Sequence, residues 1–332
     1  MKKTLQHTLF VTLFLTSSAF AQQYTLPDAL KQVDQVGSVV LAKLEVEDAQ
    51  ANLTRTLSDP LLTRPTEIQA KQRLKTAQVK YDDAVRQAQS QIVSAYTSVL
   101  EAQFQVTLLR KSSDVLEQAL KIAQIRQKNG SGTALDVKDA EQQVADAEKN
   151  VTAATNGLNL AKQSLSNLIG KFDKISDQLG LPDLPKSEAI AQIVERSPNT
   201  LQIAQAVELT QMQLDLLDPS YAAQTQIDSA KSSVTQAQQN LSDVKNSLKV
   251  QAQSLYDNLL SAQKSYNVQL KARENAKEQL ATQKKRLSGG LISPFDYLRA
   301  ELTELQSELA LLQARDTYLK AYYAFQAGSG GR

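Results

Sequence analysis

The chain has 332 residues, with 37 lysines and arginines and 35 aspartates and glutamates. A net charge of +2 is too small to indicate binding to nucleic acid. It has no cysteine and no tryptophan, and its one histidine, His7, lies close to the N-terminus. Beyond His7, this composition excludes cysteine nucleophiles, histidine catalysis and zinc sites built from histidine and cysteine. We therefore predict no enzyme and no catalytic, cofactor-binding or metal site.

The first residues have the pattern of a cleaved signal peptide. Lys2 and Lys3 precede a short apolar run, residues 8–16, and Ala19-Phe20-Ala21 has the A-x-A form of a cleavage site. The apolar run is too short to span a membrane comfortably. We predict that residues 1–21 are removed, that the exported form begins at Gln22, and that the protein resides in the periplasm or cell envelope.

The rest of the first half reads as three helical pieces. Thr25 and Asp28 have capping-box spacing and open a helix that we expect to break at Gly37-Ser38 and end at Leu57. Two prolines within residues 57–65 stop it. No glycine or proline occurs from residue 68 to residue 128, which predicts a helix about 90 Å long. Glycines at 130 and 132 then precede a helix over residues 133–169.

The second half repeats this plan. A short helix is expected within residues 184–199, broken at Ser197-Pro198, and a segment continues to Leu217. A long stretch free of glycine and proline covers residues 222–287, and a last helix is expected over residues 293–327.

Two matching turns suggest that the chain is duplicated. RQKNGSGTALDVKDAE begins at residue 126, and KRLSGGLISPFDYLRAE begins at residue 285; each has Asp six residues after a Gly and ends in Ala-Glu. The long helices match as well, because the motif around Tyr96 recurs around Tyr256, 160 residues later. We predict two helix–long helix–helix repeats, residues 22–175 and 176–330.

Helix lengths and apolar spacing predict how these pieces pack. The combined length of the two shorter helices of each repeat is nearly that of the long helix, so the two should lie end to end beside it. The last helix has two apolar seams, which requires neighbours on both sides. One contains Leu298, Leu302, Leu305, Leu309, Leu312, Leu319 and Tyr323, and the other contains Ala300, Leu311, Ala314, Tyr318, Ala321 and Phe325. A curved sheet of helices or a closed helical barrel fits this pattern; a simple bundle is the alternative.

The two glycine turns are the candidate site for docking a partner. Their glycines would allow positive φ in a tight turn, and their aspartates have the spacing of helix caps, although a charged ring at a channel mouth is the alternative. A basic residue near the end of the preceding helix interacts favourably with the helix dipole and could also contact a partner. The candidate residues are Gly130, Gly132, Asp136, Arg286, Gly289, Gly290 and Asp296.

The duplicated short–long–short helices of an exported chain resemble the TolC-like outer-membrane efflux protein family. Residues 286–330 look like that family's last helix, including its turn, and residues 26–53 look like its opening helices. The resemblance implies a trimer, a helical barrel across the periplasm, and glycine tips that meet the periplasmic adaptor of an export pump.

The chain departs from the family where the family inserts membrane strands. Only seven residues follow each of Pro60 and Pro219 before the next expected helix residue, Ile68 or Ile227. A membrane strand needs about 9–11 residues. We therefore predict an all-α, TolC-like helical barrel without a β-barrel, and association with the outer membrane through a partner.

The predicted function is that of an exported efflux or export component that forms a periplasmic tube or scaffold. A periplasmic spacer or tether without a conduit is the alternative. A pump adaptor is a second rival, although the β-rich domains that flank an adaptor's helical hairpin are not visible in the sequence.

Overall fold

The structure, a computed structural model, describes residues 24–328, so the predicted signal peptide, residues 1–21, lies outside the described residues. Within the described range the secondary structure is helical, and Tyr24 and Ile175 form an isolated β-bridge. This confirms the predicted all-α class. The division of the exported chain into repeats at residue 175 stays a prediction.

The helices follow the predicted order in both halves. The first half contains α1 (Leu26–Leu30), the short 3₁₀ helix η1 (Val33–Gln35), α2 (Gly37–Leu57), α3 (Arg64–Lys128) and α4 (Ala134–Ile169). An extended connection, residues 170–188, leads to the second half. That half contains α5 (Ala189–Glu195), α6 (Pro198–Asp215), α7 (Gln224–Ser288) and α8 (Pro294–Ala327).

Two predicted helix boundaries were wrong. The first helix breaks before Gly37, because Val36 has an extended backbone and precedes the first turn of α2. The long helix begins at Arg64 instead of Ile68, because Pro65 lies in its first turn and does not interrupt it. A proline there removes no hydrogen bond, since the first N–H groups of a helix have no partner within it. Thr63 caps this turn by accepting from the N–H of Thr66 at 3.4 Å.

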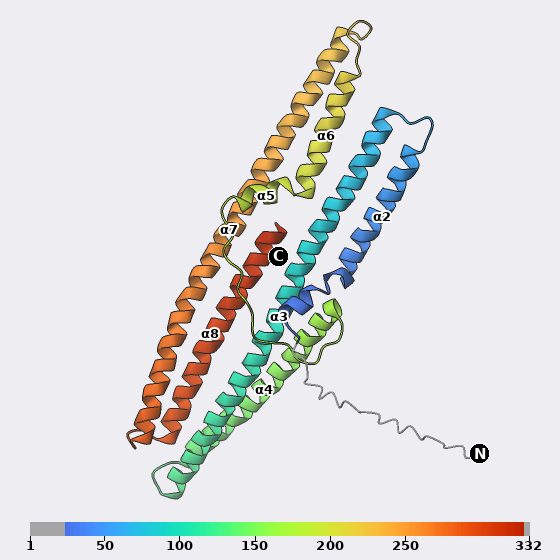
Figure 1. Cartoon of the computed structure of the whole chain (residues 1–332). Helices are drawn as coiled ribbons and strands as arrows, with labels where there is room; N and C mark the ends of the chain where they lie inside the picture. The colour runs from blue at the N-terminus through green and yellow to red at the C-terminus, as the bar shows by residue number, and fades with distance from the viewer. Residues whose placement is uncertain (1–23, 329–332) are drawn as a thin grey trace, which may run out of the picture.

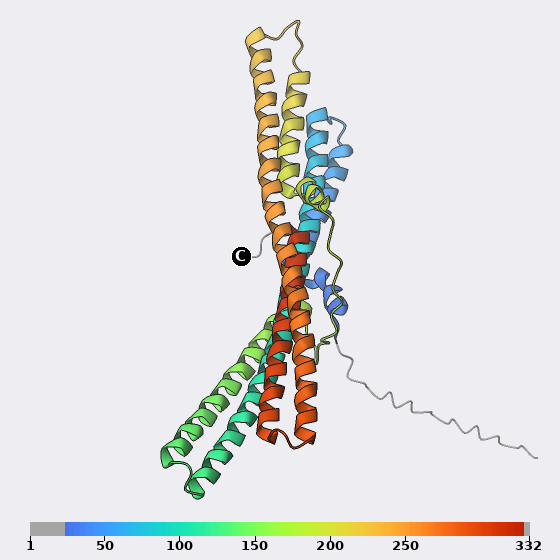
Figure 2. The same ribbon diagram turned by 90° about the vertical axis from the view of Figure 1, so that its left-hand side faces the viewer.

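Each half is a pair of helices wide. In the first half α2 and α4 pack one after the other along α3, and in the second α6 and α8 pack in the same way along α7 (Figure 1). The α3–α4 and α7–α8 turns therefore lie at one end of the molecule, and the α2–α3 and α6–α7 turns at the other (Figures 1 and 2). This confirms the predicted end-to-end layout.

Helix α8 joins the two halves, because it packs against both α3 and α7. Leu319 and Tyr323, from one predicted seam, lie in the apolar cluster that contains Ile92 of α3. Tyr318 and Phe325, from the other seam, lie in a second cluster with residues of α7 such as Leu259. The two-seam prediction is thus confirmed here, and the helices form one continuous sheet.

Candidate functional site

The two glycine turns have the same backbone hydrogen bonds. The N–H of Ser131 donates to Arg126 O, and the N–H of Leu291 donates to Arg286 O, each at 2.8 Å. This bond spans five residues, as in a Schellman motif, which requires a left-handed residue just after the helix. Gly130 and Gly290 occupy that position with φ of 74° and 69°. Glycine adopts this conformation without the penalty of a Cβ atom.

The aspartates that follow the turns cap the next helices. Thr133 accepts from the N–H of Asp136 at 3.1 Å, and the Asp136 carboxylate accepts from the N–H of Thr133 at 2.8 Å. Ser293 and Asp296 form the same reciprocal pair. Hydrogen bonds from Thr133 and from Ser293 hold the pKa of the partner aspartate below its usual value. The predicted capping boxes are confirmed, and both carboxylates stay charged at neutral pH.

The prediction of positive φ was wrong for two of the four glycines in the turns. Gly289 ends α7 with φ of −84°, and Gly132 is not among the positive-φ residues of the described chain. At Gly132 the constraint is space, because a Cβ atom would lie 3.1 Å from the Arg126 Cβ atom. Gly289 has ordinary room for a side chain.

The structure places the two tips at the same end but on separate hairpins, which diverge from one another (Figure 2). Gly130, Asp136, Arg286 and Gly290 are exposed or lie at the surface. The arrangement presents two exposed turns of the same backbone shape, which could serve as a repeated contact surface. Docking of a partner there stays a prediction.

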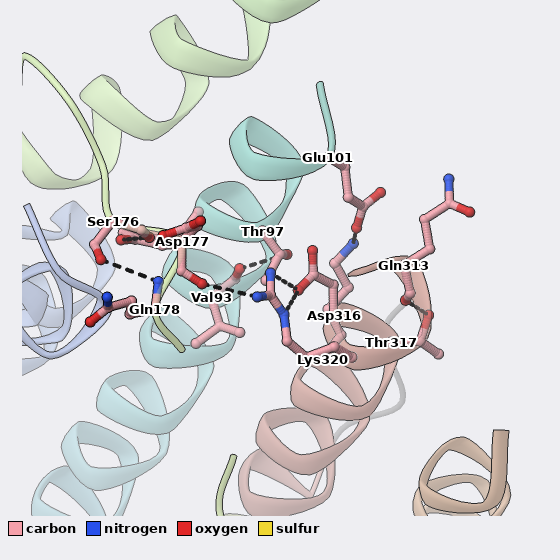
Figure 3. Close-up of polar contacts among 12 residues, drawn as sticks. Val93, Thr97, Glu101, Ser176, Asp177, Gln178, Gln313, Asp316, Thr317 and Lys320 are labelled. Carbon is pink, nitrogen blue, oxygen red and sulfur yellow. Dashed lines mark hydrogen bonds and ion pairs between the residues drawn. The ribbon is translucent and has the colours of Figure 1, made fainter. Parts of the chain in front are cut away.

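A second candidate site lies where the halves meet, along the contact of α3 with α8. Two ion pairs cross it: Lys111 Nζ lies 2.6 Å from Glu301 Oε2, and Lys320 Nζ lies 2.8 Å from Glu101 Oε1. Figure 3 shows the latter pair beside Asp316 of α8. These pairs hold together residues from the two predicted repeats.

Asp316 is a buried carboxylate at this contact. The residue is 0% exposed, as is Thr97 on the facing helix α3, and Figure 3 places both at the contact. One carboxylate oxygen, Oδ1, accepts from Arg315 Nε at 2.9 Å, whereas Oδ2 has no hydrogen-bond partner among the described residues. Burial raises the pKa of Asp316 to about 6, although the Arg315 charge opposes the change.

Arg315 also connects this contact to the segment between the halves. Its Nη1 donates to Asp177 O at 3.0 Å. Tyr96 of α3 donates to Ser176 O at 2.7 Å and lies within hydrogen-bond distance of Tyr24 O at 2.8 Å. In the second half, Tyr256 donates to Pro185 O at 3.1 Å. The tyrosines of the repeated motif therefore both bind the extended connection, which the sequence pattern did not reveal.

The sequence contained a signal for Asp316 that the predicted seams left out. The first seam of the last helix advances by four and three residues through Leu309 and Leu312, and the next position in that spacing is 316. Asp316 thus occupies a core position of a coiled-coil pattern. A polar residue at such a position commonly specifies register at a cost in stability.

Neither a metal-binding cluster nor a membrane-spanning helix is found within residues 24–328. No group of three His, Cys, Asp or Glu side chains in this range is placed to hold a metal ion. No helix in this part of the chain is long and apolar enough to cross a membrane.

Comparison with known proteins finds that part of the chain is similar to a known family. Residues 50–171, which span the C-terminal part of α2, all of α3 and all of α4, match the family model described as outer membrane efflux protein. The resemblance stated from the sequence is thereby confirmed.

One curated relative and several solved structures extend the likeness. The cobalt-zinc-cadmium resistance protein CzcC of Cupriavidus metallidurans is 27% identical over 205 residues. That match covers 55% of this chain and 49% of CzcC, so it spans about half the length of the relative.

The solved structures share the fold at low sequence identity. The CmeC outer membrane channel of Campylobacter jejuni has a TM-score of 0.64 at 12% identity, covering 92% of this chain and 86% of CmeC. The outer membrane protein VceC of Vibrio cholerae has a TM-score of 0.64 at 16% identity, covering 92% and 96%. The likeness in fold to these two outer membrane proteins therefore extends over both halves of the chain.

Proposed function

We propose that this protein is an exported component of an efflux system and that several copies assemble into a helical tube in the periplasm. The observation that carries the proposal is the open sheet of helices. Helix α8 is enclosed by α3 and α7, whereas α7 forms one edge of the sheet and α2 with α4 forms the other (Figure 1). An edge that differs from its opposite edge can repeat head to tail and close a ring.

The side chains on the edge helices support this assembly. Large apolar residues are exposed on α2, α4 and α7, among them Val40, Leu41, Leu44, Leu160, Val250 and Val268. Apolar side chains scattered singly on a surface are ordinary, but here they occur on the helices that lack a neighbour. A second copy would bury them, and a trimer is the state that the family resemblance implies.

In this tube the two glycine turns would form the end that contacts the periplasmic adaptor of a pump. They lie at one end of the rod, they are exposed, and they present the same backbone shape twice per chain. Their caps hold charged Asp136 and Asp296 against the helix ends. The opposite end, with Asp59-Pro60 and Asp218-Pro219, would face the outer membrane and a partner in it.

Cryo-electron microscopy of protein extracted from the envelope tests the proposal. A hollow ring of chains supports the tube. A solid rod supports a spacer without a conduit, which is the alternative function, and a single chain excludes assembly.

Variants of the exposed edges make this test specific. Leu160→Asp and Val268→Asp change side chains that are 65% and 62% exposed in the single chain, so helix content should persist while assembly is lost. Leu61→Asp, at a turn where the leucine is 86% exposed, is the matched control and should assemble normally. Normal assembly of both edge variants would contradict the proposed contact.

The CzcC relative suggests the first substrates to test. We propose cobalt, zinc and cadmium ions as candidates, because the name of CzcC assigns resistance to these metals. Deleting the gene in its native host should lower the tolerated metal concentration, and restoring the intact chain should recover it. Unchanged tolerance to all three metals would direct the search to other substrates.

A further inference from the structure

A cavity of about 410 Å³ lies midway along the molecule, between the two halves. It is lined by residues of α3 and α7, by the end of α8, and by the turn between α5 and α6. Figure 1 shows these segments meeting where α8 ends, just below α5. The tips and the Asp316 contact are separate from this cavity.

The charged side chains of the cavity are predominantly basic. Lys80, Arg86 and Arg196 line it together with one acidic residue, Asp83. Arg86 Nη2 lies 3.5 Å from Asp83 Oδ1, and Arg86 Nε is buried without a hydrogen-bond partner in the described chain. The lining therefore has a formal net charge of +2, and the Arg86 Nε–H group is a hydrogen-bond donor without an acceptor among the described residues.

The two arginines come from different halves and lie close to each other. Burial, and then the nearby charge of Arg86, lower the pKa of Arg196. Arg196 donates to Gln326 O at the end of α8, which satisfies one of its N–H groups. The repeated architecture does not require such a pair, because the position 160 residues after Arg86 is Asn246. Two neighbouring guanidinium groups repel one another, and an anion between them removes that cost.

The start of α6 adds to this positive field. Ser197, Pro198 and Asn199 line the cavity, and α6 begins there. The Ser197 side chain makes no capping hydrogen bond, and no acidic residue lies in the first turn. The partial positive charge of an 18-residue helix is therefore not compensated within its own first turn.

We propose that this cavity binds a phosphate-class oxyanion, held by Arg86 and Arg196 and by the N-terminus of α6. A phosphate group has close to two negative charges at neutral pH and three strong acceptor oxygens. Guanidinium groups bind such oxygens in pairs of parallel hydrogen bonds. Because the ligand would contact both halves, its binding stabilises their packing at this level of the rod.

The test is calorimetric titration of the full-length chain with inorganic phosphate, at constant ionic strength with chloride as the competing anion. We expect saturable binding and a higher midpoint of thermal unfolding in phosphate. Arg86→Gln and Arg196→Gln should each weaken binding about tenfold or more, the value of a hydrogen bond to a charged group. Lys80→Gln changes an exposed side chain, so we expect it to leave the fold intact and to weaken binding about threefold, as a more distant charge would.

Arg273→Gln is the matched control. Arg273 also has a buried Nε without a partner in the described chain, but it is paired with Glu304 and Glu308 away from the cavity. Its variant should bind phosphate with unchanged affinity. Absence of saturable phosphate binding to the wild type, binding of acetate alone, or equal binding by the Arg86, Arg196 and Lys80 variants would overturn the proposal.

A second arm identifies the source of the phosphate. Vesicles of phosphatidylglycerol and of phosphatidylcholine are sedimented with the wild type and with Arg86→Gln. Retention on phosphatidylglycerol that is lost in the variant and reversed by inorganic phosphate assigns the site to a lipid headgroup. Binding of inorganic phosphate without vesicle retention assigns it to a soluble phosphate.

Discussion

Replacing Asp316 by Asn should stabilise the protein at neutral pH and have much less effect in acid. The Asp316 carboxylate is 0% exposed, and one of its oxygens has no hydrogen-bond partner in the described chain. Burial raises its pKa from 3.8 to about 6. The folded chain therefore binds this proton more tightly than the unfolded chain does. Stability from this group is fully present below pH 3.8 and is lost as the pH rises through about 6.

The size of the effect follows from the pKa difference. A change of roughly two pKa units corresponds to about 3 kcal/mol of lost stability at full ionisation, since one unit is about 1.4 kcal/mol. Part of this loss is already present near pH 4, so roughly 2 kcal/mol should develop between about pH 4 and about pH 7.5. The neighbouring charges that set the value are Arg315 and Lys320 on α8 and Glu101 on α3. An asparagine cannot ionise, so its variant should not show this loss.

Urea unfolding of wild type and Asp316→Asn at several pH values measures the difference directly. The free energy of unfolding of the variant minus that of the wild type should grow by about 2 kcal/mol over this range. Taking the difference cancels the titration of the other carboxylates. Asp257→Asn, which changes an exposed aspartate of α7, is the control and should give a constant difference. A constant difference for Asp316→Asn as well would refute the reasoning that burial perturbs this carboxyl.

Five further substitutions test the local arguments. Gly290→Val should destabilise the tip by about 1–3 kcal/mol because φ is 69°, while Gly289→Val, at φ of −84°, should cost clearly less in urea unfolding. Ser293→Ala removes the cap of α8 and should cost about 1 kcal/mol, visible as faster amide exchange in the first turn. Tyr96→Phe leaves the buried Ser176 carbonyl without the Tyr96 donor and should cost about 1–3 kcal/mol, with earlier proteolysis of residues 170–188. Leu259→Ala, at a residue 0% exposed, should lower unfolding stability by about 2–5 kcal/mol; a value below about 1 kcal/mol would contradict tight packing.

Local signals in the sequence accounted for the helices and their turns. The long helices were predictable because glycine and proline are absent from their interiors, and no tertiary contact is needed to see this. The capping boxes at Thr133 and Ser293 were also predictable, since both partners lie three residues apart. The two seams of α8 also predicted that it has neighbours on both sides, although not which helices these are. The boundary at Arg64 was missed, because a proline ends or begins a helix depending on its position in the turn.

The tertiary structure alone decided which polar groups are buried and which charges meet. Asp316 lies at a core position of the heptad pattern, but only the packing of α8 on α3 shows that its carboxylate is removed from water. Arg86 and Arg196 are far apart in the chain and come together only because the end of α8 is enclosed by both halves. Helix formation depends on neighbours within about one turn, whereas desolvation and charge pairing depend on every element that packs nearby, including Glu101 and Lys320, which are 219 residues apart.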